Sequence, residues 1–111
     1  MPQIVTHMNR CDLIKLSGRY DSTTAPQLEE TLKASMDEGV SQIVLDMEKA
    51  EFFSSAAIRV LVMAYKACRK HRNGDVRLSN VPEKISHVLD LAGILPLIQV
   101  FDDNVLAVGS F

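Results

Sequence analysis

The chain has 111 residues, a formal net charge of −2, and a composition of 47% apolar and 23% charged residues. These values suit one globular domain, which we place at residues 1–111. They show no excess of basic residues of the kind that nucleic-acid-binding proteins carry. No segment has the roughly 20 apolar residues of a membrane span. With no signal-peptide pattern and only two isolated cysteines, the sequence predicts a cytoplasmic protein that binds neither nucleic acid nor membrane.

The first predicted elements are two short strands and a helix. Segments 4–8 and 11–16 are rich in branched apolar residues, which predicts a β-hairpin whose second strand ends at Ser17-Gly18. Thr24 begins a Thr-Ala-Pro-Gln sequence that is typical of a capping box. Leucine and methionine then recur every four residues, which predicts a helix from about 25 to 38.

The central part of the sequence predicts a buried strand followed by a longer helix. The near-continuous apolar run over 42–47 suits a strand covered on both faces, and 48–51 is expected to be a polar connection. Apolar residues at helical spacing predict a helix over 55–71, which starts at Ser54-Ser55 because serine is a favoured N-cap residue. Alternating apolar and polar residues predict another strand over 75–79.

The last part of the sequence predicts two more helices and a final strand. Asn80-Val-Pro-Glu83 is a second capping-box sequence, before a helix that ends at Gly93. Segment 97–101 is expected to be a strand, and Asp102-Asp103 to cap a short helix that runs to about 109. The order β-β-α-β-α-β-α-β-α predicts an α/β fold with a mixed, mostly parallel sheet of about five strands and with about four helices.

The densest cationic stretch consists of Lys66, Arg69, Lys70, His71 and Arg72. A helix is expected to end there, and cations near a helix C-terminus complement the helix dipole. The alternative interpretation is a surface that attracts an acidic partner.

The sequence carries no sign of catalysis. His7, His71 and His87 have no Cys, His or acid at metal-ligand spacing. There is no glycine-rich phosphate loop and no nucleophile-elbow motif, and the sequence indicates no base for Ser54 or Ser55. We therefore predict a protein that is not an enzyme and that uses neither metal nor cofactor.

The start of the second helix is the most unusual feature of the chain. Phe52 and Phe53 lead directly into Ser54 and Ser55. Ser55 is expected at the helix N-terminus, where free N–H groups and partial positive charge can hold an anion such as a phosphate. The alternative is that both serines only cap the helix.

Several segments, taken in order, resemble one known family. They are Leu16-Ser-Gly-Arg-Tyr-Asp21, Ile43-Val-Leu-Asp46, Phe52-Phe-Ser-Ser-Ala-Ala-Ile-Arg-Val-Leu61, Val88-Leu-Asp-Leu-Ala-Gly93 and 98–103. The chain resembles, over nearly its whole length, the STAS domain of anti-sigma factor antagonists. This resemblance implies that the chain is a single STAS domain, in line with the predicted order of elements.

The resemblance also implies a regulatory function. In this family a serine of the third segment is phosphorylated by a partner that is both a serine kinase and an anti-sigma factor, and by motif this serine is Ser55. The unphosphorylated protein binds this partner and so releases a sigma factor. Phosphorylation ends the binding, and a serine phosphatase reverses it.

The chain departs from the common family pattern at three positions. Ser54 stands where many members have Asp, Ala57 where Gly is usual, and Ile58 where Leu is usual. Serine removes a negative charge beside the phosphoacceptor, which either eases accommodation of the phosphate or weakens recognition by the kinase. Alanine in place of glycine requires an ordinary backbone angle at that position.

We expect the partner surface around the start of the second helix. Its residues are Asp21, Ser22, Phe53, Ser54, Ser55, Ala56 and Arg59. Asp21 is either a partner-facing acid or a turn acid. Arg59 lies on the helix face of Ser55 and pairs with the phosphate, pairs with an acidic residue of the partner, or is an ordinary exposed arginine. We expect a monomer, and the alternatives within the fold are a non-phosphorylated scaffold and a sensor subunit that binds a small molecule such as a nucleotide.

Overall fold

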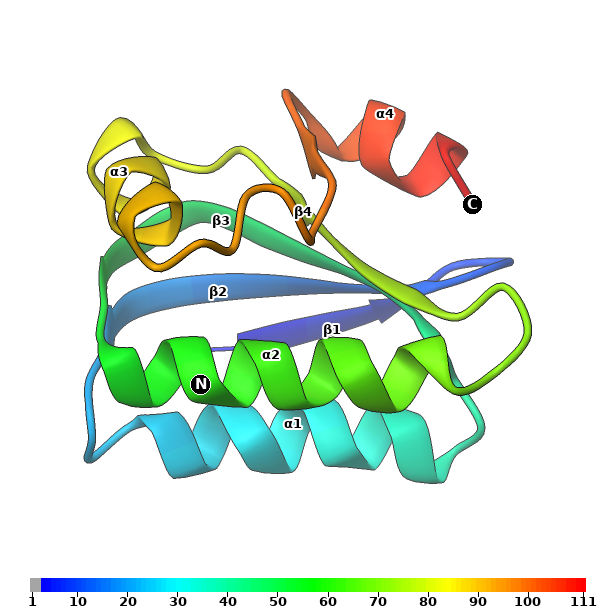
Figure 1. Ribbon diagram of the computed structural model, residues 1–111. Coiled ribbons are helices and arrows are strands. Elements are labelled where there is room, and N and C mark those ends of the chain that lie inside the picture. Colours follow the sequence, from blue (N-terminus) through cyan, green and yellow to red (C-terminus); the bar gives the residue numbers. More distant parts are fainter. Residues whose placement is uncertain (1–2) are drawn as a thin grey trace.

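A mixed five-stranded sheet forms the middle of the computed structural model, which describes residues 3–111 (Figure 1). The strands are β1 Gln3–His7, β2 Asp12–Tyr20, β3 Gln42–Phe53, β4 Asp75–Ser79 and β5 Val100–Phe101, in the spatial order β1-β2-β3-β4-β5. β1 pairs antiparallel with β2, and all the other neighbours are parallel. The predicted hairpin and the predicted mostly parallel sheet are thus confirmed.

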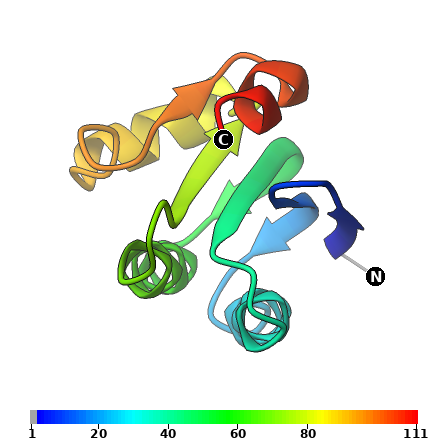
Figure 2. The same ribbon diagram turned by 90° about the vertical axis from the view of Figure 1, so that its right-hand side faces the viewer.

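Four helices cover the two faces of this sheet. They are α1 Ala25–Asp37, α2 Ser55–Arg69, α3 Glu83–Leu91 and α4 Asn104–Gly109. α1 and α2 lie side by side on one face (Figures 1 and 2), the buried side chains of α3 join the core on that face, and α4 packs on the opposite face. The element order is the predicted one, and the predicted α/β fold class is confirmed.

The main core lies between the sheet and the pair α1 and α2. Leu28 and Leu32 of α1, Leu61 of α2, and Ile43 and Leu45 of β3 are fully buried in it. Each such side chain contributes about 1.5–3 kcal/mol through burial. A smaller cluster under α4 holds that helix against the other face of the sheet. The sheet therefore fixes where the ends of the helices lie.

Two strands are longer than the sequence predicted. β2 does not end at Ser17-Gly18 but continues to Tyr20. Gly18, at φ +87°, lies in an irregular part of the β2–β3 register, and the pairing with β3 resumes after it. β3 includes 48–51 and reaches Phe53. The polar composition misled the prediction because only 42–46 of β3 pairs with β4, whereas the later part pairs with β2 alone and exposes most of its side chains.

The last strand is shorter than predicted, and both capping boxes are wrong. Only Val100 and Phe101 pair with β4, because the backbone N–H of Leu97 bonds back to Ile94 and forms a turn. Neither Thr24 nor the N-cap of α3 makes a side-chain capping bond. Asp103 does cap α4, accepting the N–H of Leu106 at 2.8 Å as predicted.

Asn80 has a role that the capping-box prediction missed. Its backbone is left-handed, at φ 52°, and its side-chain amide donates to Asp46 at 3.1 Å. Asn104 donates to the same carboxylate at 2.9 Å. Burial alone would raise the pKa of Asp46, but the hydrogen bonds from Asn104, the Glu48 N–H and Asn80 hold it below its usual value. This network ties β3, β4 and α4 together.

Candidate partner-binding surface at the start of α2

The junction between β3 and α2 distinguishes the two adjacent serines. Ser54 has an extended backbone, and its hydroxyl accepts the N–H of Ala57 at 3.3 Å. Its own N–H donates to the carbonyl of Tyr20 at 2.8 Å, which fixes the junction against the end of β2. Ser54 is therefore the N-cap of α2, in agreement with the predicted helix start at Ser54-Ser55. Ser55 is the first helical residue and is exposed.

Ser55 is available for modification, and the backbone beside it is available to an anion. Within residues 3–111, no group forms a hydrogen bond with the Ser55 hydroxyl. The N–H groups of Ser55 and Ala56 belong to the first turn and have no acceptor within the helix. The first turn reads Ser-Ala-Ala-Ile and carries no acidic side chain. This end of α2 can therefore accept negative charge.

Ala57 shows why this chain tolerates a methyl group at the position where the family usually has glycine. Its backbone does not have the positive φ that would favour glycine, and its side chain is fully buried in the main core. Ile58 is half-buried against the same core. Both departures from the family pattern are accommodated by ordinary helix packing.

Asp21 is a turn-forming acid in the loop between β2 and α1. Its carboxylate accepts the hydroxyl of Thr23 at 2.6 Å and the N–H of Thr23 at 2.9 Å. Bonds from Thr23, and then from the Thr24 N–H, lower the pKa of Asp21 below its usual value. Asp21 is only partly exposed, whereas the next residue, Ser22, is exposed. The geometry therefore favours the turn interpretation of Asp21, which sets the path of the loop that carries Ser22.

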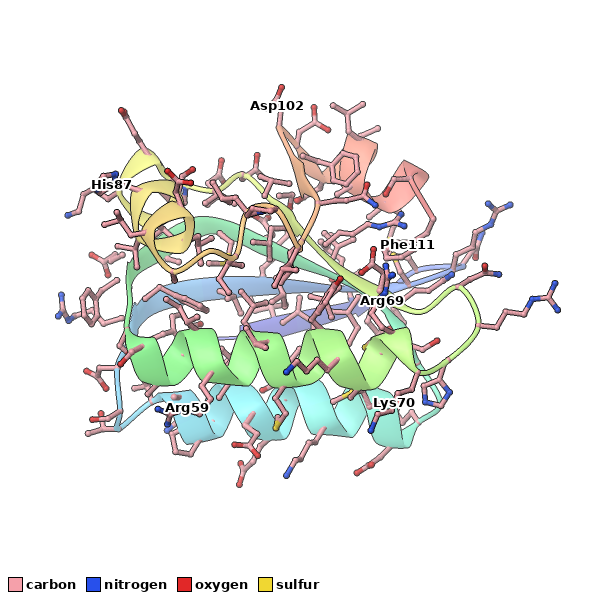
Figure 3. The ribbon with its side chains drawn as sticks, in the orientation of Figure 1. Arg59, Arg69, Lys70, His87, Asp102 and Phe111 are labelled. Carbon is pink, nitrogen blue, oxygen red and sulfur yellow. The ribbon has the colours of Figure 1, made fainter. Side chains whose placement is uncertain are left out.

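A groove of about 220 Å³ between α1 and α2 brings three predicted surface residues together. Ser22 lines it from the loop, and Ala56 and Arg59 line it from α2. The α1 side contributes Pro26 and Glu29, among others. Figure 3 shows Arg59 beside the first turn of α1. Sequence spacing alone predicted Arg59 to face Ser55, and the structure adds that it also faces α1.

Phe53 does not belong to the exposed surface, which corrects the prediction. It is 2% exposed and packs on Tyr20 with the ring centroids 5.9 Å apart. Its neighbour Phe52 is 38% exposed, and the Arg19 guanidinium lies 4.5 Å from its ring centroid. Adjacent strand residues point to opposite faces. The exposed ring was missed because this segment was predicted to be a connection and not a strand.

A large hollow adjoins the same junction and was also missed. It measures about 780 Å³ and lies between the end of β3 and α3. Glu51 and Phe52 line it from β3, and Glu83, His87 and Val88 line it from α3. Its rim combines an exposed aromatic ring with acidic groups, next to the start of α2. No sequence signal pairs these segments, because they are more than 30 positions apart.

The fold is that of a known family. The STAS domain family model matches residues 3–107, and the chain belongs to the STAS domain family. BtrV of Bordetella bronchiseptica is 30% identical over 96 residues, which cover 86% of this chain and 82% of that protein. The anti-sigma-B factor antagonist of Staphylococcus aureus is 24% identical over 87 residues, covering 78% of this chain and 80% of that protein.

Solved structures show the same architecture. An anti-sigma factor antagonist from Mycobacterium paratuberculosis has a TM-score of 0.88 at 18% identity and covers 97% of this chain and 91% of its own. The Bacillus cell fate determinant SpoIIAA in its phosphorylated form has a TM-score of 0.75 at 17% identity, with 97% of both chains covered. Its unphosphorylated form gives 0.77 at 17% identity, covering 90% of this chain and 88% of that one. Within residues 3–111, no helix is long and apolar enough to span a membrane.

Proposed function

We propose that this chain is an anti-sigma factor antagonist, a regulatory binding protein and not an enzyme. It binds an anti-sigma factor that is also a serine kinase, through the surface around the start of α2. Phosphorylation of Ser55 ends the binding, and a serine phosphatase restores it. The names of the sequence relatives support this class of function, and the exposed Ser55 at the first position of α2 supports the switch.

Ser55 is the phosphoacceptor in this scheme because the hydroxyl of the neighbouring Ser54 is already used to cap the helix. Ser54 caps α2 through the Ala57 N–H, whereas the Ser55 hydroxyl is exposed. A phosphate on Ser55 would add about −1.5 to −2 charges, beside the N–H groups of Ser55 and Ala56. Arg59, four residues later on the same helix face, can reach the added charge. These groups would hold the phosphate without a change of fold.

The phosphate acts at the interface and not on the core. The unmodified surface offers Ser22, Ala56 and Arg59 around a shallow groove, so a partner can approach the backbone of α2 closely. A doubly charged group there must be desolvated on binding and takes up space that the partner needs. Pairing with the phosphate would also withdraw Arg59 from acidic groups of the partner. Similarity to both forms of SpoIIAA supports a switch that leaves the domain folded.

The test compares binding of the anti-sigma factor from the same host to the unmodified protein and to three variants. We expect Ser55→Ala to bind as the unmodified protein does. We expect Ser55→Asp to bind at least about tenfold more weakly, because a fixed charge at the surface opposes docking. Ser54→Asp is the matched control, since it adds the same charge one residue earlier, at the cap. Equal binding by all forms would contradict the switch and favour a non-phosphorylated scaffold.

A further inference from the structure

The groove between α1 and α2 holds one charged group that has no partner. Glu29 and Arg59 are the charged side chains that line it, and the remaining lining residues are Ser22 and small or apolar side chains. Arg59 is exposed, and in the described part of the chain its guanidinium forms no hydrogen bond, ion pair or ring contact. A guanidinium group carries five N–H donors and keeps its charge in proteins. These donors are therefore free for a partner.

The acids near Arg59 are already engaged by other groups. On α1, the Nζ atom of Lys33 lies 2.9 Å from Oε2 of Glu29, at i, i+4 spacing, and this bond raises the pKa of Lys33 above its usual value. Asp21, in the loop before α1, does not line the groove, and its carboxylate accepts the hydroxyl and the N–H of Thr23. The positive charge of Arg59 is therefore not cancelled by an ion pair.

The rest of the groove offers a small apolar surface beside this charge. Pro26 of α1 is exposed, and Ala56 and Met63 of α2 are half-buried. Both helices begin at the same end of the molecule (Figure 1), and neither first turn carries an acidic side chain, so nothing there opposes an anion. At about 220 Å³ the groove is smaller than most sites for free small molecules, and it has room for side chains of a docked protein.

We propose that the anti-sigma factor places a segment with an aspartate or glutamate between apolar residues in this groove, and that its carboxylate pairs with Arg59. This inference rests on the proposed function and names the chemistry of the partner at that surface. A guanidinium fork matches a carboxylate through two parallel N–H···O bonds. A phosphate on Ser55, four residues before Arg59 on the same helix face, competes for the same donors. The switch then acts in part by taking Arg59 away from the partner.

Binding of the anti-sigma factor from the same host to Arg59→Gln tests the proposal. We expect this variant to bind about tenfold more weakly, because the carboxylate of the partner is left unpaired in the interface. Its melting temperature should stay that of the unmodified protein, since Arg59 is exposed and makes no contact of its own. The matched control is Lys66→Gln, which removes the same charge from an exposed position of α2 that does not line the groove, and which we expect to bind normally.

The double variant Ser55→Asp/Arg59→Gln shows whether the two positions act together. We expect it to bind less weakly than the product of the two single losses predicts, because Ser55→Asp already withdraws Arg59 from the partner. Losses that multiply would overturn the competition for Arg59. Normal binding by Arg59→Gln, or equal weakening by Lys66→Gln, would overturn the acidic segment and leave the Ser55 switch in place. No binding by the unmodified protein would overturn the proposed function and this inference together.

Discussion

Replacing each of the two adjacent serines by alanine should destabilise the protein unequally. Ser54 caps α2 through a hydrogen bond of 3.3 Å from Ala57, and loss of a serine cap costs about 0.5–2 kcal/mol. Because this distance is at the long end of the usual range, we expect Ser54→Ala to lower the free energy of unfolding by about 0.5–1 kcal/mol. Ser55 is exposed in the first turn, so Ser55→Ala should change it by less than about 0.5 kcal/mol.

Urea unfolding of the two variants, followed by circular dichroism, measures this difference. The loss in Ser54→Ala corresponds to a fall in melting temperature of about 2–4 °C. Ser54→Asp should recover the loss, because aspartate also caps a helix and its charge favours the N-terminus. A larger loss for Ser55→Ala than for Ser54→Ala would refute the assignment of the cap, and with it the reason for choosing Ser55 as the phosphoacceptor.

Three further predictions concern the core, the pH dependence and the α2–β4 loop. Phe53→Ala should lower the free energy of unfolding by about 3–5 kcal/mol, whereas Phe52→Ala should change it by less than about 1 kcal/mol, as urea unfolding would show. The hydrogen bond to Asp12 raises the pKa of His7, so its stabilisation is complete below the unfolded value of 6.5 and is lost as pH rises through the higher folded value. His7→Gln should remove that part of the pH dependence of the unfolding midpoint. Gly74→Ala should destabilise by at least about 1–3 kcal/mol, because its methyl group has no room under α2, and a melting temperature equal to that of the unmodified protein would contradict this.

Sequence reasoning succeeded where one local rule decides the structure. The helical spacing in α1 and α2 and the capping residues Ser54 and Asp103 gave the order of elements and the start of α2. It failed where tertiary pairing decides. The polar segment 48–51 extends as a strand because β2 pairs with it. The side-chain amide of Asn80 donates a hydrogen bond to Asp46 of β3 instead of capping α3.

The candidate surface was predictable only in part, for the same reason. Ser22, Ala56 and Arg59 come together at one groove, and the predicted partner surface had included all three. Phe53 was assigned to the surface because its inward direction depends on the strand that was not predicted. The hollow beside α3 required knowledge of which segments the sheet brings together, which no spacing in the sequence provides.

The central claim is tested most directly by mass spectrometry of the peptide that spans Ser54 and Ser55, from protein isolated from its native host under growth and under stress. The account predicts phosphate on Ser55 in one of these conditions and none on Ser54. Phosphate on Ser54, or an unmodified peptide in every condition, would contradict it.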